Sequence, residues 1–343
     1  MPRLLPLTLM LLLSFLPCLA FLPSLARADT CHGQNLIAAL PETQLAALKA
    51  RAEVPYAHGN LWVATKDGHQ ITLAGTYHLS DPRFAPILDA LAPALAAAKV
   101  LLVEAGPEEE VALKTRIASD PSLMFLTSGP TLPEQLTPQD WDRLATALKS
   151  RGMLPFMAAK MQPWLVTTLL QMPACLFPLA PGADQGLDKQ LMAQASAQHL
   201  PIKALEPYDA ILGIFGQFTA ADQLAMLQQS IRADAQSGDM AATLADSYFA
   251  GESHLFYAYS AQAMLALPGM TQAEADRENT LVDRAMIAQR NAAWIPVLEA
   301  AAQTGPVLAA FGALHLPAAT GVLNLLAKRG WTITPFASHL TPP

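Results

Sequence analysis

The stretch Ile71-Thr72-Leu73-Ala74-Gly75-Thr76-Tyr77-His78 is a short apolar run followed by a Gly-x-x-His tetrapeptide. The same pattern returns near the other end of the chain as Val307-Leu308-Ala309-Ala310-Phe311-Gly312-Ala313-Leu314-His315. A short apolar run predicts a buried strand, and a glycine after it lets the backbone turn sharply or approach a ligand closely. Each histidine is then expected just past the carboxyl end of a strand, where open α/β sheets bind ligands. The repeated pattern therefore predicts that His78 and His315 converge on one site.

The rest of the chain predicts an α/β fold around these two strands. Asp67-Gly68 separates two strand-like runs and is a strong hairpin signal. A helix of about residues 84–98 and an apolar run at residues 100–103 then give a strand–helix–strand unit, which is typical of a parallel sheet. Two more strands are expected at residues 202–205 and 332–336. Together these elements predict a mixed central sheet that is flanked by helices.

The chain between the two motifs is mainly helical in pattern. Thr137-Pro138 is an N-cap followed by proline at the first helical position, and Thr219 opens a capping box. Prolines interrupt the apolar stretch 161–179, which argues against a membrane span there. We expect one α/β domain over residues 29–343, with a helical insertion at about 107–200.

Residues 1–28 have the form of a secretory signal peptide. Arg3 gives a positive start, the following residues are mostly apolar, and Ala26-Arg27-Ala28 matches a small-x-small cleavage site. We expect cleavage after Ala28 and a periplasmic or secreted mature protein without stable membrane insertion. An uncleaved membrane anchor is the alternative, because the apolar run is long enough to span a bilayer.

The amino-acid composition limits the classes of partner that the chain can bind. The chain has 21 Lys and Arg against 28 Asp and Glu, a net charge of −7, and no long basic run. This balance argues against nucleic acid and anionic membranes as partners. Cys31 and Cys175 both follow the predicted cleavage site, and either a disulfide between them or two buried thiols would suit an exported protein. The sequence does not indicate an oligomeric state.

Two further predicted strands end in a carboxylate, Glu104 and Glu206. Histidines with carboxylates form a ligand set that suits zinc, manganese or cobalt. Such an ion lowers the pKa of bound water and polarises a carbonyl, and a spare carboxylate can act as general base. No metal-binding spacing motif is present, so the metal interpretation depends on the constellation alone. Each of these side chains could also be an ordinary loop residue.

A polar pair on the predicted long helix of residues 271–302 adds candidates. Arg290 and Asn291 lie one turn before Trp294 and could orient a carboxylate, or they could be surface residues. The chain has no Gly-x-Ser-x-Gly elbow, which weakens a serine hydrolase interpretation.

At these residues the sequence resembles the TraB/GumN family, which includes the TIKI proteins and is distantly similar to the erythromycin esterase and ChaN group. The resemblance covers about residues 60–336 and implies an α/β core with a metal site. TIKI proteins are regarded as divalent-metal-dependent proteases, a role that carries over onto His78, Glu104 and His315. The matching segments are Leu73–Leu79, Val103-Glu104, Gly186–Asp188, Leu205-Glu206, Arg290-Asn291 and Phe311–Leu316. One departure is Gly321, which comes later after the second histidine than in many members and bears on the loop geometry.

The sequence and this resemblance together predict an exported hydrolase. We expect a manganese, cobalt or zinc ion at His78, Glu104 and His315, with Glu206, Arg290 and Asn291 assisting cleavage of a peptide or amide bond. The substrate would be a peptide or a small molecule. The alternative is a non-catalytic protein that sequesters a peptide, haem or a metal ion in the same pocket.

Overall fold

The computed structural model describes residues 33–177, 185–267 and 269–336. Within these residues six strands form one mixed sheet in the order β4-β3-β5-β2-β1-β6. The four strands β4, β3, β5 and β2 run parallel, and β1 is antiparallel to both of its neighbours. The predicted α/β fold with a mixed sheet is therefore confirmed. The strands are β1 (Leu61–Lys66), β2 (His69–Thr76), β3 (Val100–Val103), β4 (Ile202–Ala204), β5 (Val307–Gly312) and β6 (Thr332–Pro335).

The predicted hairpin joins β1 and β2. Asp67 and Gly68 have φ angles of 50° and 81°, as the two central positions of a tight hairpin turn require. Beyond the hairpin, β2 pairs with β5 in parallel register, with Thr76 opposite Gly312. The two Gly-x-x-His motifs therefore leave adjacent strands at the same edge of the sheet.

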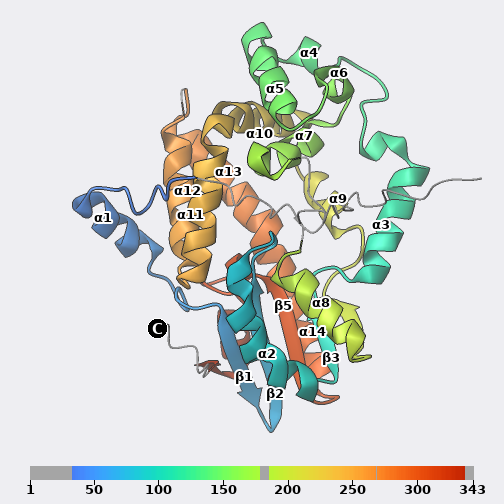
Figure 1. Cartoon of the computed structure of the whole chain (residues 1–343), viewed down its shortest axis with the longest axis vertical. Coiled ribbons are helices and arrows are strands. Elements are labelled where there is room, and N and C mark those ends of the chain that lie inside the picture. Colours follow the sequence, from blue (N-terminus) through green and yellow to red (C-terminus); the bar gives the residue numbers. More distant parts are fainter. Residues whose placement is uncertain (1–32, 178–184, 268, 337–343) are drawn as a thin grey trace, which may run out of the picture.

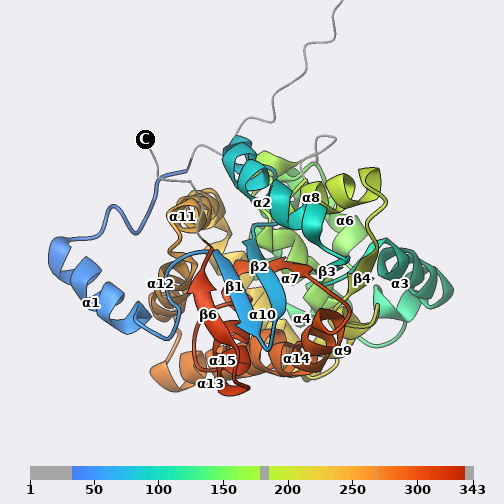
Figure 2. The same ribbon diagram turned by 90° about the horizontal axis from the view of Figure 1, so that it is seen from below.

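Helices cover both faces of the sheet, as Figure 2 shows. One face packs on α14 (Gln289–Ala302) and α15 (Val322–Lys328), through a core that includes Leu73 and Ala309. The other face packs on α2 (Ala85–Ala97) and α8 (Leu187–Ala197), through a core that includes Leu308. Because the central strands are buried on both faces, they read as continuous apolar runs in the sequence.

Helices also fill the chain between the two motifs, on both sides of β4. The helices α5, α7 and α10 enclose a separate apolar core, and with α4 and α6 they form what we call the helical lobe, seen above the sheet in Figure 1. The remaining bounds are α1 (Glu42–Ala52), α3 (Pro107–Ser119), α4 (Leu132–Gln135), α5 (Pro138–Ser150), α6 (Pro155–Ala158), α7 (Pro163–Gln171), α9 (Ala210–Phe215), α10 (Ala220–Ala233), α11 (Ser237–Phe249), α12 (Ser253–Leu265) and α13 (Gln272–Val282). Short single turns are η1 (Pro82–Phe84), η2 (Pro121–Leu123), η3 (Ala174–Leu176), η4 (Asp234–Gln236) and η6 (Ala313–His315).

Some sequence predictions fall outside the described residues. The signal peptide, its cleavage after Ala28 and Cys31 all lie before residue 33. Cys175 is disulfide-bonded. In the part of the chain that the structure describes, no helix is long and apolar enough to cross a bilayer.

Candidate functional site

The carboxyl ends of four parallel strands bring the predicted site residues to one edge of the sheet. Gly312, the last residue of β5, lies at the centre of this group. Its N–H donates a hydrogen bond of 2.7 Å to Glu104 Oε1. A Cβ atom at this position would lie 3.2 Å from His78 Nε2, 3.3 Å from Glu104 Oε1 and 3.6 Å from His315 Cδ2. Glycine therefore leaves the space in which His78, Glu104 and His315 approach one another.

The Arg290 guanidinium connects this group to Glu206, and all five of its N–H donors are used. Nη2 donates to Glu104 Oε2 at 2.6 Å and to Glu206 Oε1 at 2.7 Å, while Nε donates to Glu206 Oε2 at 2.8 Å. Nη1 donates to the Met286 carbonyl and to His315 Nε2, both at 3.2 Å. Trp294 Nε1 adds a bond of 3.1 Å to Glu206 Oε2. Arg290 thus binds two carboxylates and one imidazole at once.

The helix that carries Arg290 contains a π-helical segment just before it. Residues Asp283–Ala288 (η5) are π-helix between α13 and α14, and Arg290 follows two residues later. A π-helix is rare and is found often at functional sites, because its wider turn shifts the side chains after it around the helix. Past this turn Arg290, Asn291 and Trp294 all face the strand ends.

The His315 ring is buried, with the residue 5% exposed, and its hydrogen bonds define its tautomer. Asn291 Nδ2 donates to the carbonyls of His315 and Thr320, so Asn291 Oδ1 is the atom 2.6 Å from His315 Nδ1. An amide oxygen only accepts and a guanidinium only donates, so Nδ1 carries the proton and Nε2 accepts from Arg290. Burial lowers the pKa of His315 to about 4, with Arg290 and His78 adding to the effect against Glu104. His315 is therefore neutral near pH 7.

The His78 side chain, in contrast, is 57% exposed. Its Nδ1 lies 3.2 Å from Asp188 Oδ1, and its Nε2 lies 4.0 Å from Glu104 Oε1. Desolvation by the surrounding protein would lower the pKa of His78, but the hydrogen bond to Asp188 and the charges of Glu104 and Asp188 outweigh it and raise the pKa. Asp188 therefore orients the ring with Nε2 toward Glu104.

Gly186 brings Asp188 close enough for this contact. A Cβ at Gly186 would lie 2.5 Å from both Cα and C of His78, so only glycine allows this approach. The next residue, Leu187, donates its N–H to the Tyr77 carbonyl at 3.0 Å. The start of α8 is thereby held against the loop that carries His78.

Glu104 is held as a carboxylate. Burial would raise its pKa, but a positive His315, Arg290, His78 and the Gly312 N–H together lower it far below the usual range. Because His315 is neutral near pH 7, Arg290 is the permanent positive charge that faces Glu104 there.

The structure places the predicted site residues in three roles. His78 and Glu104 line the open part of the site; Arg290 and Glu206 form the ion pair behind them; Asn291 is fully buried and holds His315. Sequence reasoning missed Asp188 as a site residue, although Gly186-Leu187-Asp188 at a helix start was a usable signal. It also missed the Gly312 N–H and the π-helix, for which we find no sequence signal.

The divalent ion that the resemblance implies does not fit this donor set. Both Glu206 oxygens, Glu104 Oε2 and His315 Nε2 accept from Arg290, and His315 Nδ1 is protonated. Among the residues that the structure describes, both oxygens of Glu104 and both ring nitrogens of His315 have hydrogen-bond partners, whereas His78 Nε2 accepts no hydrogen bond. Across residues 33–177, 185–267 and 269–336, no group of three or more His, Cys, Asp or Glu side chains is placed to hold a metal ion. The Arg290 guanidinium lies among the nitrogen and oxygen atoms that would have to bind such an ion.

The motifs at this site also define the relatives of the chain. No curated protein matches the chain. The TraB/PrgY/gumN family model matches residues 60–335, which include both Gly-x-x-His motifs, Glu104, Glu206 and Arg290. The chain therefore belongs to the TraB/PrgY/gumN family.

Proposed function

We propose that the chain is a hydrolase that cleaves a peptide or amide bond at the exposed edge between His78 and Glu104. We further propose that it acts after export, in the periplasm or outside the cell, because its first 28 residues have the form of a signal peptide. One observation carries the hydrolase proposal. An exposed imidazole is oriented by a carboxylate on one nitrogen and directs the other toward a second carboxylate.

This arrangement can activate water. The 4.0 Å between His78 Nε2 and Glu104 Oε1 is too long for a direct hydrogen bond but suits a water that bonds to both. His78 Nε2 would take a proton from this water while its oxygen attacks the carbonyl carbon. The proton then passes to the leaving nitrogen as the C–N bond breaks, which gives an acid and an amine. The hydrogen bond to Asp188 helps raise the pKa of His78 and so strengthens this imidazole as a base.

The remaining residues position this pair. Gly312 N–H and Arg290 each hold one oxygen of Glu104, so the carboxylate has a single orientation. Arg290 has no free N–H for a substrate oxygen, since all five donors are bound. Glu206 in turn holds Arg290, and Trp294 holds the Glu206 carboxylate. We therefore assign a positioning role to Arg290, Glu206 and Asn291.

The proposed reaction uses His78 and a water molecule rather than a metal ion, because Arg290 is bound to the atoms that would hold one. A divalent ion would need Arg290 to withdraw from Glu104 and His315. The assay below therefore includes manganese, cobalt and zinc, and a chelator, as separate arms.

The test is hydrolysis of a library of fluorogenic peptides by the mature chain and by His78→Ala. We expect the variant to lose activity about 10²–10⁴-fold, the range for loss of a general base. The matched control is His69→Ala, which removes the histidine at the opposite end of β2. Asp188→Asn should lower the pKa of the acid limb of kcat/KM, because it removes the carboxylate that raises the His78 pKa.

Three outcomes would contradict the proposal. Full activity in His78→Ala would place the reaction elsewhere. Cleavage that appears only with manganese, cobalt or zinc and vanishes in chelator would restore a metal-dependent reaction. Stoichiometric peptide binding without product would indicate the non-catalytic binding protein instead.

A further inference from the structure

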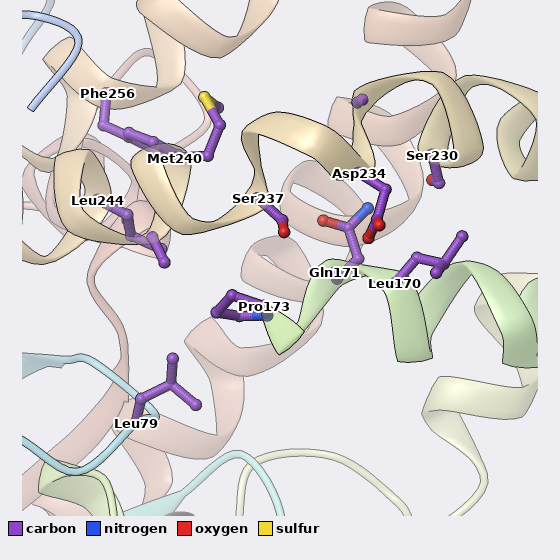
Figure 3. Close-up of a pocket in the computed structure, with 12 residues that line it drawn as sticks. Leu79, Leu170, Gln171, Pro173, Ser230, Asp234, Ser237, Met240, Leu244 and Phe256 are labelled. Atoms are coloured by element: carbon purple, nitrogen blue, oxygen red, sulfur yellow. The ribbon is translucent and has the colours of Figure 1, made fainter. Parts of the chain in front are cut away.

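A pocket of about 240 Å³ opens between the helical lobe and the loop after β2 (Figure 3). Its walls come from α7, α10, η4, α11 and α12, together with Leu79. The apolar part of the lining includes Leu79, Leu170, Leu244 and Phe256. This volume lies below the range of roughly 300–1,000 Å³ that holds a whole drug-sized ligand, so the pocket suits a single side chain.

The pocket is connected to the proposed reaction centre through two elements. Leu79 directly follows His78, and consecutive Cα atoms are about 3.8 Å apart. On the opposite wall, α11 carries Ala241 and Leu244 of the lining. The same helix carries Tyr248, whose buried hydroxyl donates to the Gly75 carbonyl at 2.9 Å, three residues before His78. The pocket wall is therefore attached to the strand end that positions His78.

The polar end of the pocket carries no unbalanced charge. Figure 3 shows Gln171, Ser237 and Asp234 turned toward one another there. Arg151 Nη2 donates to Asp234 Oδ1 at 2.6 Å, and the same guanidinium donates to the Met172 carbonyl at 2.8 Å and 3.0 Å. The Arg151 side chain is 1% exposed, so its charge is matched to Asp234 rather than to solvent. Asp234 is the one charged side chain in the described lining, and because it is already paired with Arg151, an ion on a ligand would find no unpaired counter-charge there.

We propose that this pocket receives a neutral side chain of the substrate beside the scissile bond, aliphatic or aromatic, such as leucine, methionine, phenylalanine or tyrosine. This inference rests on the proposed hydrolase function and adds its substrate class. The apolar walls bury the side chain, and Ser237 and Gln171 can bond to a hydroxyl or amide at its tip. Lysine, arginine, aspartate and glutamate are excluded, because each would bring an unpaired charge into a half-buried apolar site.

The kinetic test compares peptides that differ only in the residue next to the cleaved bond. We expect kcat/KM to be at least about tenfold higher for leucine or phenylalanine than for lysine or aspartate, since even one methylene contributes about 10–200-fold in a hydrophobic pocket. Ala241→Phe fills the pocket and should raise KM for the leucine peptide about tenfold. The matched control, Ala221→Phe, alters an exposed position of α10 and should leave KM unchanged.

A second variant keeps the proposal testable if Ala241→Phe fails to fold. Phe256→Ala enlarges the pocket, and its preference should move from leucine toward tryptophan. Equal cleavage of neutral and charged peptides, or an unchanged KM in Ala241→Phe, would overturn the inference while leaving the hydrolase intact.

Binding separates the two proposals. In His78→Ala, N-acetyl-leucinamide should still shift the NMR methyl signals of Leu79 and Leu244, and N-acetyl-lysinamide should not. If the wild type binds in this way but hydrolyses no peptide, the hydrolase proposal is wrong and the pocket proposal stands. If it hydrolyses peptides but these methyl signals do not shift, the pocket proposal is wrong and the hydrolase proposal stands.

Discussion

The carboxyl ends of β2 and β5 carry the same Gly-x-x-His motif and lie side by side, yet they give their histidines opposite environments. After β2, His78 is exposed and pairs with the carboxylate of Asp188, and its pKa is raised. After β5, His315 is buried between the amide of Asn291 and the guanidinium of Arg290, and its pKa is lowered to about 4. The sequence motif therefore specifies where an imidazole is placed, and its neighbours decide what it does.

The difference assigns the two histidines different work. A buried neutral imidazole with both nitrogens bonded has no lone pair for a substrate, so His315 serves to hold Arg290. An exposed imidazole with one free nitrogen can exchange protons. A pair of metal ligands would need an unoccupied ring nitrogen on each histidine, and both nitrogens of His315 are hydrogen-bonded.

The largest effect is expected from Arg290→Met, which removes the cation that His315 and both carboxylates share. The variant should lose about 3–5 kcal/mol of unfolding free energy at pH 7, since buried carboxylates are left without their partner. Urea unfolding measures this loss, and it should shrink at acid pH, because Glu104 takes up a proton more readily once the Arg290 charge that lowers its pKa is gone. Arg329→Met is the control, because its ion pair with Glu299 is 56% exposed on the arginine side and should contribute little to stability.

The same variant tests the cation position. Without Arg290, the lone pairs of His315 Nε2 and Glu104 Oε2 become available, so metal uptake should appear in Arg290→Met and be absent from the wild type. Metal content by mass spectrometry decides this. A stoichiometric ion in the wild-type protein would show that Arg290 does not hold these donors.

The two histidines should titrate on opposite sides of the ordinary value of 6.5. NMR of the ring protons should place His315 near pH 4 and His78 above 6.5. The unfolded chain binds a proton at His315 between about pH 4 and 6.5 and the folded chain does not, so stability falls by about 3 kcal/mol as the pH drops through this window. His78 acts in the opposite sense, because its stabilisation is lost as the pH rises through its raised pKa. Equal titration of the two rings would remove the contrast between the strand ends.

Removing the hydrogen-bond partner of each histidine ring should lower the unfolding free energy by different amounts at the two strand ends. Asn291→Leu leaves the His315 Nδ1–H buried without an acceptor, which should lower the unfolding free energy by about 1–3 kcal/mol. Asp188→Leu leaves His78 in contact with water and removes an acid from the first turn of α8, so the loss should stay within about 1 kcal/mol. Similar losses in the two variants would mean that His78 is as structural as His315.

The sequence predicted the sheet and the meeting of the motifs because both depend on local patterns. Apolar runs, Asp67-Gly68 and the parallel strand ends were sufficient for that. The sequence could not predict which histidine is buried. This depends on Arg290 and Asn291, which face the strand ends after the π-helical segment of residues 283–288. The expectation that Arg290 orients a carboxylate agrees with its bonds to Glu104 and Glu206, but the sequence pattern could not show that the same guanidinium also binds His315.

The smallest predicted effect concerns the loop that follows His315, where Ala318 has a φ of 77°. A left-handed alanine is strained by roughly 1–2 kcal/mol, whereas glycine adopts this conformation without strain. Glycine also gains roughly 0.5–1 kcal/mol of freedom in the unfolded chain, so Ala318→Gly should stabilise the protein by only about 0.5–1 kcal/mol. The control is Ala319→Gly, at an exposed neighbour without a positive φ, which should destabilise through the unfolded-state effect alone. The change in unfolding free energy, measured by urea unfolding, should therefore be positive for Ala318→Gly and negative for Ala319→Gly. The bond from Ala318 N–H to the Pro55 carbonyl, 2.8 Å long, explains why the loop holds this backbone conformation despite its cost. If both variants lose stability, the strain lies elsewhere and the loop after β5 is no more constrained than the loop after β2.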